Sequence, residues 1–251
     1  GIVNGIDSSS WNPATDSALP ERFSAENTSG KRLCKKRFCL EHELDPDKPL
    51  FVSLGRLVEQ KGIDVLLAAM PQIIENGANV CLAGSGDAQI EELASSVARV
   101  FPGRVAYLGY VSEDDARRLL AAGDFLIMPS RWEPCGIVQL QAMCYGALPI
   151  GRRTGGLADT IIDANERPRA ANGILFDELS VEAIVQVTAR SSAMGRWRNT
   201  ADAKASPASG AAGAGPPEEG SGTCSTTVAR NASARGSGRA IAKVAAAPIT
   251  T

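Results

Sequence analysis

The stretch PLFVSLGRLVEQKGIDVLLAAMPQIIENGANVCLAG, residues 49–84, decides the fold of this 251-residue chain. It begins with a short apolar run (49–55), continues with a segment of helical periodicity (61–77) and returns to a second apolar run (79–84). Short apolar runs that flank a helical pattern are typical of buried strands joined by a crossover helix. The stretch therefore predicts a parallel βαβ unit.

The same alternation continues to about residue 191. Further strands are expected at 104–110, 124–130, 147–151 and 173–176, and further helices at 87–101, 112–123, 136–146, 155–163 and 180–191. The sequence thus predicts an α/β fold, a doubly wound Rossmann-like parallel sheet with helices on both faces. In such a sheet ligands bind beyond the carboxyl ends of the strands, where the strand-to-helix loops lie.

The ends of the chain differ from this central region. Residues 1–49 are irregular and then helical in spacing, which predicts a linker with a lead-in helix before a domain at 50–195. Residues 196–251 are dominated by Ala, Gly, Ser and Thr, with no aromatic residue from position 200 onward. Burial there is too small to offset an ordering cost of about 1–2 kcal/mol per residue, so a disordered C-terminal tail is expected.

Composition and charge exclude several functional classes. The chain is 44% hydrophobic and 22% charged, as ordinary globular proteins are, and has a formal net charge of −2. This charge gives no reason to expect a nucleic acid or an acidic membrane surface as partner. No apolar run approaches the length of a membrane span, so no membrane partner is expected.

Cysteine and histidine usage argues against a metal site and a histidine-based hydrolase. The six cysteines lack paired spacing, and His42 is the single histidine. We expect reduced thiols, a buried one at Cys81 within a predicted strand, and a reducing compartment. No metal ligand set is predicted.

The loop GRLVEQKG, residues 55–62, places two cations after the first predicted strand. Arg56 and Lys61, bracketed by Gly55 and Gly62, could clamp a diphosphate through charge-assisted hydrogen bonds. The alternative is that both are solvated surface charges.

The loop RWEPCG, residues 131–136, combines a carboxylate with a thiol before a predicted helix. Gly136 is expected to open that helix and to leave N–H groups for an oxyanion. Glu133 could act at a ligand or simply complement the helix dipole, which is worth about 0.3–1 kcal/mol. A nucleophilic role for Cys135 is disfavoured because His42 is the only candidate base.

The loop RRTGGLADT, residues 152–160, offers the Thr154 hydroxyl and the N–H groups of Gly155 and Gly156 to phosphate oxygens. Together the three loops predict an anion site with one carboxylate among cations. Such a site suits a nucleoside diphosphate whose attached group must be oriented. NAD fits less well, because no acidic residue follows a GxGxxG at the ribose-binding distance.

Five motifs carry a family resemblance, namely GIVNGIDSSSWNP, GRLVEQKG, LAGSGD, PSRWEPCGIVQLQAMCYG and RRTGGLADT. In their order and approximate spacing the chain resembles bacterial glycogen synthases and plant or algal starch synthases, over residues 1 to about 190. The resemblance implies a GT-B glycosyltransferase of two domains. This chain would be its C-terminal, donor-binding half, and the N-terminal acceptor domain would be its partner.

The resemblance also implies the activity: transfer of glucose from ADP-glucose to the non-reducing end of an α-1,4-glucan, with retention of configuration and without metal or cofactor. This half alone is expected to be inactive. The implied roles are diphosphate neutralisation by Arg56 and Lys61, contact with the glucosyl group by Glu133, lining of the sugar site by Cys135 and Gly136, binding of the distal phosphate by Thr154, Gly155 and Gly156, and stacking on adenine by Tyr110.

Two other functions remain open. One is a non-catalytic module that binds a nucleotide or a glucan. The other is a sucrose- or trehalose-type transferase, which Gln141 disfavours because related enzymes usually carry a second glutamate eight positions after the first. Localisation would be plastidic in a plant or alga and cytoplasmic in a bacterium. Replacing Arg56 or Lys61 by alanine is expected to lower turnover and to leave the fold intact.

Overall fold

The computed structural model describes residues 4–193. The predicted tail at 196–251 lies outside this range. The helices are α1 (Ser29–Glu41), α2 (Ile63–Glu75), α3 (Ala88–Val100), α4 (Glu113–Ala122), α5 (Val138–Cys144), α6 (Gly155–Thr160) and α7 (Val181–Ala193), with a 3-10 turn η1 (Glu59–Lys61). The strands are β1 (Leu50–Leu54), β2 (Asn79–Ala83), β3 (Val105–Tyr107), β4 (Phe125–Met128), β5 (Leu148–Arg152) and β6 (Ile174–Phe176).

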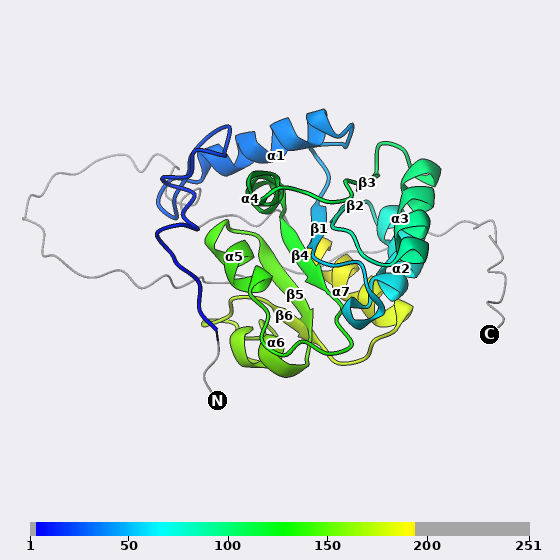
Figure 1. Ribbon diagram of the computed structural model, residues 1–251. Coiled ribbons are helices and arrows are strands. Elements are labelled where there is room, and N and C mark those ends of the chain that lie inside the picture. The colour runs from blue at the N-terminus through cyan, green and yellow to red at the C-terminus, as the bar shows by residue number, and fades with distance from the viewer. Residues whose placement is uncertain (1–3, 194–251) are drawn as a thin grey trace, which may run out of the picture.

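All six strands form one parallel sheet in the order β3-β2-β1-β4-β5-β6 (Figure 1). This confirms the predicted α/β, doubly wound, Rossmann-like fold. The chain first adds strands on one side of β1 and then returns to add β4 on its other side. The loops that follow β1 and β4 therefore diverge, and they leave a crevice at the carboxyl edge where a ligand can bind.

Helices cover both faces of the sheet, with α1, α4 and α5 on one face and α2, α3 and α7 on the other (Figure 1). Successive residues of β1 alternate between the two cores, so that Leu50 and Val52 join the first and Phe51 joins the second. The Phe51 ring stacks on that of Phe125 in β4, with centroids 4.8 Å apart. Burial on both faces explains why the strands read as continuous apolar runs.

The predicted helix starts are confirmed in part. Ser112 caps α4 by accepting a hydrogen bond from the N–H of Asp115. The helix predicted from residue 136 begins instead at Val138, because Gly136 has a φ of 73°, outside the helical region. The helix predicted over 155–163 is also shorter and ends at Thr160.

The segment before the sheet is fastened to α4 by polar contacts. Arg117 donates to the carbonyl oxygen of Ser10 at 2.6 Å, and its guanidinium lies 4.3 Å from the ring centroid of Trp11. Asp16 accepts hydrogen bonds from Arg117 and from the fully buried Tyr145. A chain segment that appeared irregular in the sequence is thereby held at defined points.

The lead-in segment also contributes to the hydrophobic core. Leu19, Phe23, Phe38 and Leu44 are buried in the same cluster as Leu50 and the inner residues of α4. The predicted boundary at residue 49 therefore does not separate two packing units, because α1 covers one face of the sheet. Helical spacing alone could not distinguish a linker helix from a helix of the domain.

Cys34, Cys39 and Cys81 are buried thiols outside any disulfide. Burial raises the pKa of the Cys39 thiol to about 11 and also raises the pKa of Cys34 and Cys81. This agrees with the expected reduced, buried thiol at Cys81.

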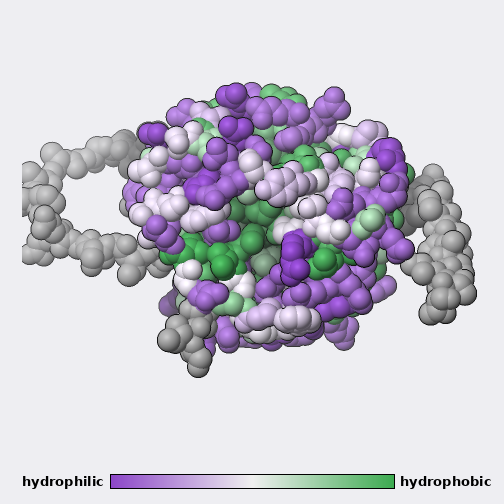
Figure 2. Space-filling view, viewed as in Figure 1, coloured by the Kyte–Doolittle hydropathy of each residue, from purple (hydrophilic) through white to green (hydrophobic). Residues whose placement is uncertain are grey.

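On the face shown in Figure 2, hydrophilic residues surround hydrophobic surface near the middle. No helix in the described part of the chain is long and apolar enough to cross a membrane.

Lys31 ties α1 to the ends of two other helices. Its Nζ donates to the carbonyl oxygens of Ala121 and Gly123, at the C-terminus of α4, and of Tyr145, which caps α5, at 2.9–3.1 Å. Helix C-termini leave carbonyl oxygens without partners within the helix, and their dipoles favour a cation. One ammonium group thus binds three carbonyl oxygens at the ends of α4 and α5.

We expect Lys31→Met to lower the free energy of unfolding by about 2 kcal/mol, because methionine keeps the apolar stem and leaves three carbonyl oxygens without this donor. Denaturant unfolding measures the change. Lys36→Met, at an exposed position of the same helix, is the matched control. Equal stability of the two variants would contradict the prediction.

Candidate functional site

A hollow of about 220 Å³ lies at the carboxyl ends of β1 and β4. The residues that line it are Ser53, Leu54, Gly55, Arg56, Lys61, Ile63, Ile127, Met128, Pro129, Ser130, Glu133, Gly136, Ile137 and Val138. Two loops that are far apart in the sequence therefore meet at the reversal of strand order. Four predicted site residues share this hollow: Arg56, Lys61, Glu133 and Gly136.

The carboxylate of Glu133 is buried and paired. Its Oε2 lies 2.5 Å from Nζ of Lys61 and accepts a second hydrogen bond from the Ser130 hydroxyl at 3.2 Å. The Glu133 side chain is only 7% exposed, and that of Lys61 is 22% exposed. Ser130 was not among the predicted site residues, although it stands three residues before Glu133 in the same loop.

Arg56 lies at the mouth of the same hollow, on an exposed position after β1. Together with Lys61 and Glu133, it gives the lining of the hollow two cations and one carboxylate. A planar guanidinium presents several N–H donors in a fixed fork, which matches phosphate oxygens. The cation pair can therefore hold an anion over Glu133.

Gly136 adopts a left-handed backbone conformation, with a φ of 73°. A Cβ atom at this position would lie 2.5 Å from Oε1 of Gln139, which is fully buried below the loop. Cys135 is half-buried, and its Sγ accepts a hydrogen bond from the backbone N–H of Asn4 at 3.1 Å. Gly136 lines the hollow, whereas Cys135 is held against the lead-in segment, which runs past α5 toward this loop (Figure 1).

The Thr154–Gly156 loop packs directly on the loop of Glu133. A Cβ on Gly155 would lie 2.1 Å from the carbonyl oxygen of Glu133, and one on Gly156 would lie 2.0 Å from that of Cys135. The N–H of Gly156 donates to the Glu133 carbonyl oxygen at 2.9 Å, and that of Thr154 donates to Arg152. One of the two N–H groups expected to bind phosphate, that of Gly156, is thus already engaged, and the phosphate role of this loop stays a prediction.

Gln139 and Thr160 fasten the same two loops from below. The Gln139 side-chain amide donates to the carbonyl oxygen of Cys135 at 3.2 Å and to the Thr160 hydroxyl at 3.1 Å. Thr160 in turn donates to the carbonyl oxygen of Gly156 at 2.6 Å. Each side chain therefore holds the loop before its own helix, and the Gln139–Thr160 hydrogen bond joins the two.

Comparison with known proteins identifies the family. The model for glycosyl transferases group 1 matches residues 37–195, which is more than half of the chain. The chain belongs to the group 1 glycosyl transferases.

Within this family, the chain is similar in sequence to bacterial glycogen synthases. The chain is 41% identical over 211 residues to a glycogen synthase of Rhodopseudomonas palustris, a match that covers 79% of this chain and 43% of the relative. It is 40% identical over 196 residues to the glycogen synthase of Edwardsiella ictaluri, with 76% and 41% covered. The chain thus spans less than half the length of these relatives.

Two solved structures are similar to the chain in fold. The catalytic domain of starch synthase IV from Arabidopsis thaliana, bound to ADP and acarbose, matches with a TM-score of 0.69 and 29% identity, covering 81% of this chain and 47% of that one. HepE from Anabaena in complex with UDP-glucose matches with a TM-score of 0.58 and 21% identity, covering 80% of this chain and 49% of that one, which shows the shared fold. The resemblance to glycogen and starch synthases and their GT-B fold is confirmed.

Tyr110 lies apart from the other predicted residues of this group 1 glycosyl transferase. It follows β3 at the edge of the sheet, is 82% exposed and does not line the hollow. Its expected role in stacking on adenine stays a prediction.

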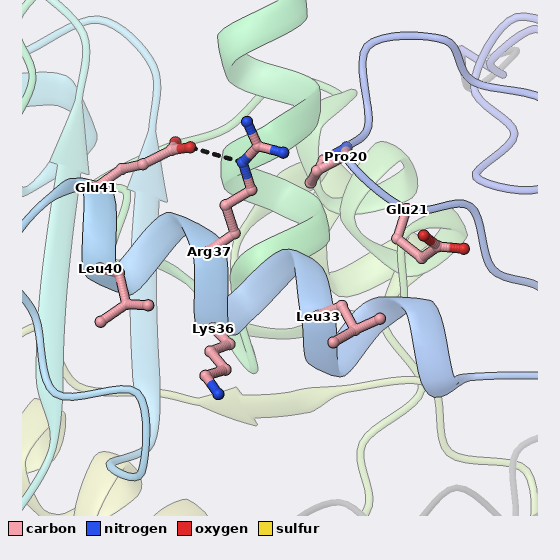
Figure 3. Close-up of a pocket in the computed structure, with 7 residues that line it drawn as sticks. All are labelled: Pro20, Glu21, Leu33, Lys36, Arg37, Leu40 and Glu41. Carbon is pink, nitrogen blue, oxygen red and sulfur yellow. Dashed lines mark hydrogen bonds and ion pairs between the residues drawn. The ribbon is translucent and has the colours of Figure 1, made fainter.

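A larger hollow, of about 480 Å³, lies on the outer face of α1 (Figure 3). It is lined by Pro20, Glu21, Leu33, Lys36, Arg37, Leu40 and Glu41. Arg37 and Glu41 form an ion pair on its rim. The hollow contains none of the predicted site residues, so we place the functional site at the carboxyl edge of the sheet.

The pairing of Glu133 changes one expectation from the sequence. Replacing Lys61 by alanine would leave a carboxylate buried without its cation, which usually costs about 3–5 kcal/mol. This cost argues against the expectation that the substitution leaves the fold intact, and an unfolding measurement on the variant tests it. The exposed position of Arg56 supports the same expectation for Arg56→Ala.

We expect Lys61→Met to lower the free energy of unfolding by about 3 kcal/mol, and the double variant Lys61→Met/Glu133→Gln to recover most of that loss. The double variant removes both charges and so leaves no buried carboxylate. Denaturant unfolding of the single and double variants measures the coupling between the two side chains. Additive losses would contradict the inferred ion pair.

We expect Gly156→Ala to lower the free energy of unfolding by about 1–3 kcal/mol, because its methyl group would meet the backbone of Cys135. Gly5→Ala is the matched control, since nothing lies within 4 Å of a Cβ at that position. Thermal or denaturant unfolding compares the two. A Gly156→Ala variant as stable as the control would show that the loops can separate freely.

Proposed function

We propose that this chain is the donor-binding half of an α-glucan synthase, which transfers glucose from ADP-glucose to the non-reducing end of an α-1,4-glucan with retention of configuration. The observation that carries the proposal is the Lys61–Glu133 pair in a hollow that also holds Arg56. Support comes from the similarity to bacterial glycogen synthases and to a starch synthase structure bound to ADP and acarbose.

The two cations would stabilise the leaving group. When the bond between glucose and the diphosphate breaks, negative charge grows on the ADP oxygens, and fixed cations nearby lower the barrier. The Lys61 ammonium has three N–H donors, so it can keep Glu133 and still bind a phosphate oxygen. Arg56, exposed at the mouth, would close over the diphosphate with its planar fork.

Glu133 would act on the glucosyl group by charge and position. Because its Oε2 already accepts hydrogen bonds from Lys61 and Ser130, the carboxylate is held in one orientation. A fixed negative charge near the anomeric carbon favours the positive charge that develops there. We therefore assign Glu133 an electrostatic role and no covalent one.

We propose that the reaction needs no metal or other cofactor, because Arg56 and Lys61 meet the charge of the diphosphate. The acceptor glucan would bind between this chain and an acceptor-binding half, which the longer relatives have room for. The enzyme would work where ADP-glucose is made, in the plastid of a plant or alga or in the bacterial cytoplasm.

A second candidate is a module that binds the nucleotide without turnover. Such a module would use the same hollow, because Arg56 and Lys61 can bind a diphosphate whether or not transfer follows. Calorimetry with ADP, together with an assay of glucosyl transfer to glycogen in the presence of an acceptor-binding half, distinguishes the two. Binding with transfer supports the synthase, and binding without transfer supports the module. Absence of ADP binding would contradict both.

We expect Arg56→Ala to weaken ADP binding by about 10-fold or more, because one charge-assisted contact to phosphate is lost. Its unfolding free energy should stay close to that of the wild type, since the side chain is exposed. Arg99→Ala, an exposed arginine paired with Glu92 on α3, is the matched control. Addition of EDTA should leave the affinity for ADP unchanged; a loss on chelation would contradict the metal-free proposal.

A further inference from the structure

An ion pair outside the hollow joins the two loops that line it. Arg131, two residues before Glu133, donates from Nη1 and Nη2 to the two carboxylate oxygens of Asp64 at 2.7 and 2.8 Å. Asp64 stands in the first turn of α2, three residues after Lys61. A bidentate pair of this kind fixes orientation as well as distance.

Further contacts of the same loops run parallel to this pair. The backbone N–H of Arg131 donates to the carbonyl oxygen of Gln60 at 2.8 Å, and Nη1 of Arg131 donates to that of Glu59 at 2.6 Å. The side-chain amide of Gln60 donates back to the carbonyl oxygen of Trp132 at 3.1 Å. The two residues before Lys61 are thus linked to the two residues before Glu133.

The two loops are in contact at Gly62, which packs against the backbone of the loop that follows β4. A Cβ on Gly62 would lie 2.0 Å from the carbonyl oxygen of Pro129, and its φ of 66° is left-handed. No side chain can therefore separate the loops at this point. The Asp64–Arg131 pair then ties the first turn of α2, directly after Lys61, to the loop that carries Glu133.

We propose that Asp64 and Arg131 are positioning residues, whose ion pair holds Lys61 at the distance from Glu133 that donor binding requires. The inference rests on the function proposed above. Neither residue lines the hollow, so the pair acts through Lys61. The hydrogen bonds from Arg131 lower the pKa of the Asp64 carboxyl, so the pair stays charged near neutral pH.

The exposure of the pair separates positioning from stability. The Arg131 and Asp64 side chains are 32% and 40% exposed. Pairs this exposed contribute little to stability, because solvent screens them. A loss of affinity without a loss of stability is therefore the signature of a positioning role.

The test uses the chain as it exists, with ADP as the probe in calorimetry and with thermal unfolding alongside. Asp64→Asn and Arg131→Lys should each weaken ADP binding by about 5- to 10-fold, while the melting temperature changes by no more than about 2 °C. Glu41→Gln, which removes the Arg37–Glu41 pair on α1, is the matched control and should change neither quantity.

A mutant cycle tests whether the pair acts through Lys61. In a Lys61→Met background, Asp64→Asn should cause almost no further loss of ADP affinity, whereas in an Arg56→Ala background it should cause its full loss. Equal losses in both backgrounds would overturn the inference, as would wild-type affinity in both Asp64→Asn and Arg131→Lys. Absence of ADP binding by the wild-type chain would instead refute the proposed function, and the inference with it.

Discussion

A buried carboxylate needs a cation, and the arrangement of the site depends on this requirement. Glu133 and Lys61 are 72 residues apart in the sequence, and they meet because the strand order reverses between β1 and β4. The reversal creates the crevice, and the ion pair joins the two loops that line it. The other contacts, from Ser130, Gly62 and Arg131, hold the two loops at the separation that the pair needs.

The sequence predicted the elements well, because strands buried on both faces leave apolar runs that are easily distinguished from helical spacing. It could not predict the strand order, since an apolar run such as Phe125–Met128 does not specify its neighbours. It also misplaced the start of α5. A glycine such as Gly136 adopts helical and left-handed backbone equally well, so its residue type does not indicate which one occurs.

The residue types of the candidate site could be predicted from the sequence, but the residues to which they form hydrogen bonds could not. Arg56, Lys61, Glu133 and Gly136 stood out as charges and glycines after strands, and the fold brings them to one hollow. Long-range polar contacts leave no local pattern. The contacts by which Arg117 fastens the lead-in segment to α4 could therefore not be predicted, nor could the packing of Phe23 and Phe38 in the same core as Leu50.

The two glycines of the Thr154–Gly156 loop lie so close to the backbone of Glu133 and Cys135 that neither loop has room of its own. In protein engineering the two loops therefore have to be replaced together. A designer who wishes to change the donor sugar would have to transplant residues 129–137 together with 154–160, including the Gln139–Thr160 contact beneath them. Grafting one loop alone would set a foreign backbone against a surface that tolerates no additional atom.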